Sequence, residues 1–415
     1  MKRLLLLTLP LFLYADSLKS LVEYAQKSNE LIVSKSISVN SKKSEVKSSE
    51  SNYYPTVDVG GFYQRYDDPS PMSPGTTYSG YTTIGFDIYD GGSKEYTLKQ
   101  KEDELSASRF VYEATKKSMT LSIVQDFYNI KTNEATLKAR EEASNAVKAQ
   151  LDRMKSFYEA KLATSDDVDR LQSAYDSNIY NIESIKFKIL TLKKSLELKV
   201  GKEIETFDTS HFNKIEDSQT LELDTIKALR AQQNSILNAS QTIDSYYYPQ
   251  IRLEDTFSLY GYDDEPSVPG FNIDLPENQN KIMATITMRL IDFGTIGEAK
   301  EAARLNADAL SQEILYKNKE QKMNQDLALS RIETAKLNIK SAKSALKAAE
   351  SALVTITKKY NNGIVDNVVY LDALTLQTES KSTYEASLNN LELSYALYYY
   401  YNGKNLEEYL NDNEH

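Results

Sequence analysis

The sequence contains no cysteine and no tryptophan, and its only histidines are His211 and His415. Without cysteine there can be no disulfide, no thiolate metal site and no cysteine nucleophile. With two histidines, a zinc site and histidine-based acid–base catalysis are also disfavoured. The remaining residues show no set of nucleophile, base and orienting group that would converge on one point. We therefore expect a protein that is not an enzyme and that has no cofactor and no metal site.

An excess of positive charge is also missing. The net charge is −11 over 415 residues, which argues against nucleic acid as a partner because a phosphate backbone binds surfaces rich in Lys and Arg. No stretch of the expected mature chain has 18 consecutive apolar residues, so no helix is expected to span a membrane. If the chain enters a membrane, it does so as strands. Tyrosine is abundant, at 30 residues, and suits positions that are half wet and half apolar, such as a membrane interface.

Residues 1–15 are predicted to be a secretory signal peptide. Lys2 and Arg3 form a positive start, and the apolar stretch Leu4–Leu13 that follows is too short to cross a bilayer. Ala15 is the expected cleavage point. The mature protein is therefore expected outside the cytoplasm.

A strand that leads directly into a very long helix occurs twice. Residues 84–92 alternate apolar with small or polar side chains, and from Ser93 to about Phe157 the period becomes helical with no proline or glycine. The same change occurs at residues 286–294, and a second long helix follows from about Gly297. This pattern predicts long helical hairpins that are each joined to a pair of strands.

Further elements follow from the same patterns. Helices are expected over Ser17–Asn52, Ser93–Phe157, Ser165–Val200, Thr220–Tyr246, Gly297–Lys359 and Val368–Asn402. Strands are expected over residues 56–66, 81–90, 250–260 and 281–292, with loops at Asp67–Gly80 and Gly261–Asn280. The tyrosine cluster Tyr398–Tyr401 is expected in the core rather than at a ligand site.

The two halves of the chain are an internal repeat. Its landmarks keep a constant offset of 202, which relates Asp90 to Asp292, Tyr158 to Tyr360, and Gly201 to Gly403. Such a repeat indicates two copies of one supersecondary unit placed side by side. We assign residues 16–201 to the first repeat, 202–219 to an equatorial segment, 220–403 to the second repeat, and 404–415 to a C-terminal equatorial tail.

The number of strands has a consequence for assembly. Four strands per chain cannot close a barrel, and open strand edges are not tolerated in lipid. If these are membrane strands, the chain must therefore oligomerise, with eight strands in a dimer or twelve in a trimer.

Short motifs mark the ends of these elements. Tyr53-Tyr54-Pro55 and Tyr247-Tyr248-Pro249 precede the strand pairs, Asp-Gly-Gly and Asp-Phe-Gly follow them, and residues 158–168 and 360–370 form the hairpin tips. In this ordered set, over nearly the whole mature chain, the sequence resembles the TolC-like outer membrane efflux family.

The resemblance implies a fold and a function. The fold is a homotrimer whose strands form a twelve-stranded transmembrane β-barrel among the lipids of the outer membrane of a Gram-negative bacterium, with a long α-helical tunnel in the periplasm. The function is a passive exit duct for efflux or type I secretion. Its partners are a periplasmic adaptor and an inner-membrane pump, either RND-type or an ABC exporter. The alternative is a periplasmic coiled-coil scaffold without a channel.

The resemblance also assigns roles to residues. The junction between barrel and tunnel is expected at Asp90, Gly91, Gly92, Asp292, Phe293 and Gly294. The periplasmic gate is expected at Asp167, Tyr360 and Asp372. For Asp167 a structural alternative stands beside the gate, because Thr164 and Asp167 have the spacing of a helix capping box. Val369 stands where many relatives carry a second pore aspartate.

Docking of the adaptor is expected at the hairpin tips, through Lys161, Leu162, Ala163, Thr164, Gly363, Ile364 and Val365. Lys161 stands where the first tip of relatives usually has glycine, which makes that contact weaker or specific to one partner. For Leu162 and Ile364, packing between the hairpins is the alternative to docking.

Overall fold

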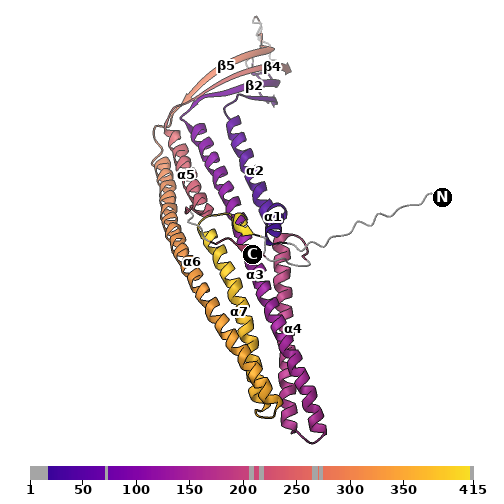
Figure 1. Cartoon of the computed structure of the whole chain (residues 1–415). Coiled ribbons are helices and arrows are strands. Elements are labelled where there is room, and N and C mark those ends of the chain that lie inside the picture. Colours follow the sequence, from indigo (N-terminus) through magenta and orange to yellow (C-terminus); the bar gives the residue numbers. More distant parts are fainter. Residues whose placement is uncertain are drawn as a thin grey trace, which may run out of the picture. The chain divides into compact units, whose positions relative to one another are not determined.

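The computed structural model describes residues 17–70, 73–204, 210–214, 219–263, 270 and 274–411 (Figure 1). The chain divides into two compact units, and each draws on both halves of the sequence. The hairpin unit consists of Met1–Ser36, Tyr112–Asp224 and Lys317–His415, and the sheet unit of Ile37–Val111 and Thr225–Tyr316. The two sequence repeats are therefore not the two compact units.

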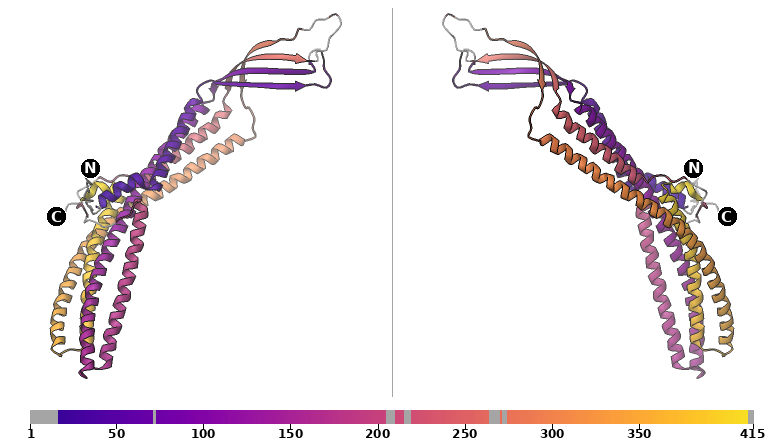
Figure 2. Two further views of the ribbon diagram at one scale, coloured as in Figure 1. Left: turned by 90° about the vertical axis from the view of Figure 1, so that its right-hand side faces the viewer. Right: turned by 90° about the vertical axis from the view of Figure 1, so that its left-hand side faces the viewer.

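The long helices confirm the repeat. Helix α3 (Ser93–Glu159) and helix α6 (Thr295–Asn361) both have 67 residues, and their returning partners α4 (Ser165–Val200) and α7 (Asn367–Tyr401) have 36 and 35. In the hairpin unit the two hairpins lie side by side (Figure 2). None of the helices in the described ranges is both long and apolar enough to cross a membrane.

The first expected helix is in fact two helices, α1 (Leu18–Ser28) and α2 (Glu30–Ser51). Asn29 lies between them with an extended backbone, and its side-chain oxygen accepts the N–H groups of Leu31 and Ile32. Its amide nitrogen donates to the carbonyl of Lys199 at 2.8 Å. Asparagine thus caps a new helix start, which a search for proline and glycine breaks does not detect.

A second difference lies at the start of the second repeat. Helix α5 covers Asp224–Asp244 and is followed by a 3₁₀ turn, η1 (Ser245–Tyr247), so the expected helix begins four residues later than Thr220.

Two apolar clusters hold the hairpin unit together. The larger one joins α1, α3, α4, α6 and α7 around fully buried residues such as Leu21, Phe127 and Leu196. The smaller one lies near the hairpin tips and contains Val147, Leu171, Tyr370 and Leu374.

The equatorial segment and the C-terminal tail meet in a small sheet. Strand β3 (His211–Phe212) pairs with β6 (Leu410–Asn411), which follows a 3₁₀ turn, η2 (Leu406–Tyr409). Tyr399 is 1% exposed, stacks on Tyr409 at 3.9 Å between ring centroids, and donates its hydroxyl to the carbonyl of Asn213. The tyrosines at 398 and 399 therefore belong to the core, as expected.

The sheet unit contains four antiparallel strands in the order β1–β2–β4–β5 (Figure 2). They are β1 (Thr56–Arg65), β2 (Thr76–Asp90), β4 (Gln250–Asp263) and β5 (Asn278–Thr287). Strand β2 starts within the expected loop Asp67–Gly80, because residues 76–80 pair with both β1 and β4. Strand β5 ends at Thr287, opposite the first residue of β4, so Met288 and Leu290 lie beyond the ladder, although the expected strand over residues 281–292 included them.

The register gives the sheet one apolar and one polar face. Directly paired residues point to the same side, so Val57 with Ile84, and Phe86 with Leu253, fall on one face. The apolar face carries mainly Val57, Val59, Ile84, Phe86, Leu253, Phe257, Ile282 and Ile286, and the opposite face Asp58, Thr83, Glu254, Thr256 and Lys281. Asp255 is an exception on the apolar face.

Candidate functional site: the strand–helix junction and the hairpin tips

An aspartate precedes the first residue of each long helix, Asp90 before Ser93 of α3 and Asp292 before Thr295 of α6. Asp90 accepts the N–H of Gly92 at 3.1 Å and that of Lys94 at 2.6 Å. Asp292, its equivalent in the repeat, accepts the N–H of Gly294 at 3.0 Å and that of Ile296 at 2.8 Å. The bond from Ile296 is the main cause of the lowered pKa of Asp292. Both aspartates therefore fix the turn and cap the helix that follows.

The two residues after each aspartate have left-handed backbones. The φ angles are 74° at Gly91 and 88° at Gly92, and 55° at Phe293 and 91° at Gly294. At Gly91 a Cβ atom would lie 2.4 Å from the carbonyl oxygen of Ser245, so no larger residue fits there without a backbone shift. At Gly294 no atom lies within 4 Å of such a Cβ, so the φ angle is the only constraint.

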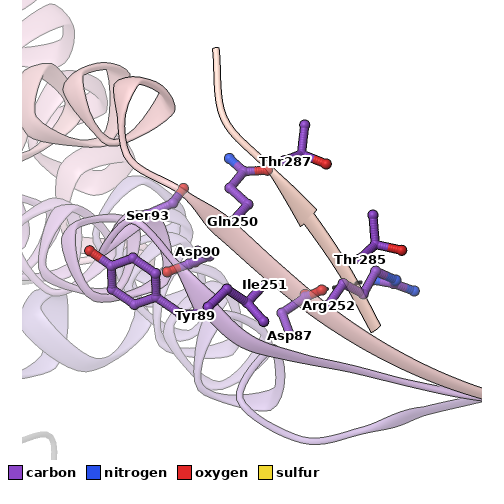
Figure 3. A pocket seen from close by; sticks show the side chains of 9 residues that line it. All are labelled: Asp87, Tyr89, Asp90, Ser93, Gln250, Ile251, Arg252, Thr285 and Thr287. Carbon is purple, nitrogen blue, oxygen red and sulfur yellow. Dashed lines mark hydrogen bonds and ion pairs between the residues drawn. The ribbon is translucent and has the colours of Figure 1, made fainter. Parts of the chain in front are cut away.

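The polar face of the sheet carries an ion cluster next to this junction, which the sequence did not suggest (Figure 3). Arg252 binds Asp87 at 2.9 Å and Glu254 at 2.8 Å, and Lys94 binds the other oxygen of Asp87 at 3.1 Å. The cluster borders an open cavity of about 360 Å³. Each charge in the cluster already has a partner of opposite sign. The cluster therefore stabilises the strand ends and is not a strong binding site for a further ion.

Both hairpin tips use the same helix end. The N–H of Lys161 donates to Tyr158 and that of Leu162 to Phe157, at 2.9 and 2.8 Å. In the second hairpin, Gly363 and Ile364 make the equivalent bonds to Tyr360 and Lys359, at 3.0 and 2.9 Å. Each pair of bonds forms a Schellman motif, which needs one left-handed residue.

Lys161 occupies that left-handed position in the first tip, with φ 61°, and Gly363 occupies it in the second, with φ 71°. The first tip therefore has lysine where the second tip has glycine, but both residues adopt the same left-handed backbone conformation. Nothing lies within 4 Å of a Cβ at Gly363, which explains why a side chain is tolerated at the equivalent position.

The remaining tip residues predicted to dock an adaptor differ in exposure. Leu162 is 76% and Ile364 67% exposed, so neither packs between the hairpins of its own chain. Ala163 and Val365 are half-buried, and the exposed Thr164 caps helix α4. Docking by these residues stays a prediction.

Asp167 forms the capping box that its spacing indicates. Its Oδ2 accepts the hydroxyl of Thr164 at 2.8 Å and the N–H of Thr164 at 3.3 Å, while its own N–H donates to the Thr164 hydroxyl at 3.3 Å. Its Oδ1 accepts a further bond, at 3.3 Å, from the side-chain amide of Asn367 on the other hairpin. The capping role is confirmed, and the gate role of Asp167 stays a prediction.

The other two predicted gate residues have different surroundings. The ring of Tyr360 stacks on that of Tyr370, with centroids 5.0 Å apart and an angle of 15°. Burial raises the pKa of Tyr360, nearby Arg153 opposes this, and the charge of Asp167 adds to it. Tyr360 also packs against the same apolar cluster as Val168, the residue after Asp167. Asp372 is exposed and has no partner within the described part of the chain.

Three residues at the tips were missed by the sequence reasoning. Tyr370 is 4% exposed and supports Tyr360, Asn367 is 3% exposed, and Arg153 donates to the side chain of Asn361 at 2.7 Å. Asn367 and Tyr370 both lie within the tip motif, but that motif does not indicate which residues meet across the hairpins.

Comparisons with known proteins agree with this architecture. Residues 21–191 match the family model described as "Outer membrane efflux protein". No curated protein matches the sequence.

Several solved structures share the fold over nearly the full length. The outer membrane channel CmeC of Campylobacter jejuni is 14% identical, with a TM-score of 0.83, over 95% of this chain and 87% of CmeC. A membrane protein from Pseudomonas aeruginosa is 13% identical, with a TM-score of 0.82, over 93% of each chain. The outer membrane protein VceC of Vibrio cholerae is 13% identical, with a TM-score of 0.79, over 94% of this chain and 96% of VceC.

The sequence match covers most of the first repeat, and the second repeat has the same hairpin and the same helix ends. Residues 21–191 thus match the outer membrane efflux protein family, and the chain as a whole has the fold of these solved outer membrane proteins.

Proposed function

We propose that three copies of the chain form one channel, in which the four strands of each copy join into a closed barrel and the hairpins of the hairpin unit line its periplasmic end. The observation that carries this proposal is the sheet itself. Strands β1 and β5 each have one unpaired edge within the described chain, and one face of the sheet is apolar. In lipid the strand edges must be paired, and pairing β5 of one copy with β1 of the next does this. The apolar face is then turned outward and covered by the lipid.

The scaffold alternative does not account for that face. Val59 is 81%, Ile282 71% and Ile286 70% exposed. A protein surrounded by water rarely exposes such a patch without a partner. A lipid bilayer is the partner that fits a sheet whose other face is polar.

The periplasmic end of the channel is closed at the tips, in this proposal, by Asp167, Tyr360 and Asp372. Three copies of the exposed Asp372 form an acidic ring around the axis, which selects against anions and favours cations at the constriction. Tyr360 narrows the same end, supported by its stack on Tyr370. Because Val369 replaces a second acidic residue, the ring is single.

The exposed tip residues Leu162 and Ile364 dock the tips of a periplasmic adaptor. Two apolar side chains per copy, at 76% and 67% exposure, give six apolar contacts around a trimer. The adaptor links the channel to an inner-membrane RND-type pump or ABC exporter, which supplies the energy for efflux or type I secretion. The channel itself remains a passive duct.

The experiment combines assembly with conductance. Outer-membrane fractions should contain a species that migrates as a trimer on SDS gels without heating and as a monomer after heating. In planar bilayers, the double variant Tyr360→Ala/Asp372→Ala should have a higher single-channel conductance than the wild type. Glu350→Ala, which removes an exposed carboxylate from α6, is the matched control and should leave conductance unchanged. A water-soluble monomer would rule out the trimeric channel, and unchanged conductance of the double variant would rule out the gate assignment.

A further inference from the structure

The side chain of Asn367 joins the two hairpins at their tips. Asn367 is the first residue of α7 and is 3% exposed. Its amide nitrogen lies 3.3 Å from the carbonyl oxygen of Asp167 and 3.3 Å from Oδ1 of the same residue. An amide NH₂ group can donate two bonds, and here both go to one residue of the other hairpin.

Helix α7 does not need Asn367 for its own capping. The side chain of Asp366 accepts the N–H of Val369 at 3.1 Å and fills the N-cap position. The residue that corresponds to Asn367 in the first hairpin is Ser165, which is exposed. The buried amide is therefore a feature of one hairpin only, and the contact it makes runs from α7 to α4.

Other contacts join the same two tips. Arg153 of α3 donates to the side chain of Asn361 at the end of α6, and Leu171 of α4 lies in the same apolar cluster as Tyr370 of α7. Among these contacts, the bond from Asn367 is the one that reaches a predicted gate carboxylate. Asp167 uses Oδ2 for Thr164 and Oδ1 for Asn367, so its carboxylate is held on both sides.

We propose that Asn367 is a positioning residue of the gate, which latches α7 to α4 within one protomer and thereby holds Asp167 and the neighbouring Tyr360 in the closed arrangement. This inference builds on the proposed gate. When the tip of α7 moves away from α4, the bonds from Asn367 to Asp167 must break. The latch therefore shifts the equilibrium toward the closed state, in addition to whatever contacts form between copies.

An exchange of the two side chains tests the latch. Asn367→Asp places two carboxylates against each other and should increase the open fraction in planar bilayers. Asn367→Ala should raise the ratio of open to closed events about fivefold, which is the factor that one hydrogen bond of ordinary net strength contributes. The double variant Asp167→Asn/Asn367→Asp restores an amide facing a carboxylate with the polarity reversed, and should return the open fraction toward the wild-type value.

An engineered disulfide between the two positions, which can be reduced again, gives a second measurement. Because the chain has no cysteine, Asp167→Cys/Asn367→Cys introduces a single pair. Its oxidised form should stay closed and its reduced form should open. If Asn367→Asp lowers the yield of SDS-resistant trimer, recovery of that yield in the exchanged double variant is the readout instead.

The outcomes separate the latch from the gate. An open fraction of Asn367→Asp equal to that of the wild type, or an exchanged variant no more closed than Asn367→Asp, overturns the latch. If Tyr360→Ala/Asp372→Ala raises conductance while the latch variants are silent, the latch is wrong and the gate stands. If Asn367→Asp and Asn367→Ala raise the open fraction while Tyr360→Ala/Asp372→Ala leaves the conductance unchanged, the latch stands. The assignment of Tyr360 and Asp372 to the gate is then wrong.

Discussion

The two halves of the chain share one backbone but place glycine differently at its left-handed positions. The first half has Gly91 at the junction and Lys161 at the tip, whereas the second half has Phe293 and Gly363 at the equivalent places. Phe293 is fully exposed, while Gly91 lies against the carbonyl of Ser245. A positive φ angle alone does not require glycine, because Lys161 and Phe293 both have one. Glycine is required where a Cβ atom would also meet the backbone.

The largest expected effect is at Gly91. Gly91→Val adds a clash with Ser245 to an unfavourable φ, whereas Gly294→Val adds only the strain of φ, about 1–2 kcal/mol. Gly92→Val should resemble Gly294→Val, because the nearest atom to its Cβ is on Tyr96 at 3.6 Å. We expect all three to lower the yield of SDS-resistant trimer, with Gly91→Val the lowest. A yield for Gly91→Val equal to that for Gly294→Val would show that the close approach is unimportant.

The second-largest expected effect is a difference between the two tips in their affinity for the adaptor. Leu162→Asp and Ile364→Asp each remove an exposed apolar contact, and burial of one such side chain is worth about 1.5–3 kcal/mol. Because Lys161 adds a charge to the first tip alone, we expect Ile364→Asp to weaken adaptor binding more than Leu162→Asp. Affinity measured with the purified adaptor checks the order. Equal losses would mean that Lys161 does not weaken its tip, and no loss in either variant would contradict tip docking.

A smaller effect is expected from exchanging the left-handed residues of the tips. Lys161→Gly should stabilise the first tip and Gly363→Lys should destabilise the second, each by about 1 kcal/mol, because a Cβ in this conformation is strained. The temperature at which the trimer dissociates should rise for the first variant and fall for the second. Shifts of the same sign would show that other contacts of Lys161 matter more than its backbone.

The smallest expected effect concerns pH. Glu392 accepts the N–H of Phe212 at 2.7 Å and lies 3.5 Å from His211, and its equivalent in the first half is the exposed Leu190. Burial raises the pKa of Glu392 above its ordinary value of 4.5, although the bond from Phe212 and nearby His211 oppose the shift. A raised folded-state pKa means that this group's stabilisation is complete below its unfolded pKa and is lost as pH rises through the folded pKa.

Glu392→Gln keeps an acceptor for Phe212 and does not titrate. Relative to this variant, the wild type should lose thermal stability as pH rises from about 4 toward neutrality. Parallel melting curves for the two proteins over that range would contradict the assignment.

Much of the fold could be predicted because its signals are long and periodic. Helix α4 has the expected bounds of Ser165–Val200, and the offset of 202 predicts the equal length of α3 and α6. The break at Asn29 could not be predicted in the same way, since it depends on a bond to Lys199, far away in the sequence. Strand β2 was expected too short because Ser79 and Gly80 favour a loop, whereas pairing with two neighbours extends the strand to Thr76.

In the candidate site, too, local contacts could be predicted from the sequence, whereas contacts between distant residues could not. The capping box of Thr164 and Asp167 is local, and its spacing is visible in the sequence. The contact of Asn367 with Asp167 depends on how the two hairpins pack, and the stack of Tyr370 on Tyr360 depends on how α6 and α7 pack within the second hairpin. One sequence indicates that both tips exist but not which side chains face each other.

The equal length of α3 and α6 limits how this protein can change during evolution. Both helices have 67 residues, and beyond their far ends the returning helices α4 and α7 meet through the short side chains of Asp167 and Asn367. Deleting one helical turn from α3 alone would shift its tip by about 5.4 Å relative to that of α6, more than a hydrogen bond between short side chains can follow. Insertions and deletions are therefore expected to survive only as matched pairs in the two halves, so that tunnel length evolves in coupled steps rather than helix by helix.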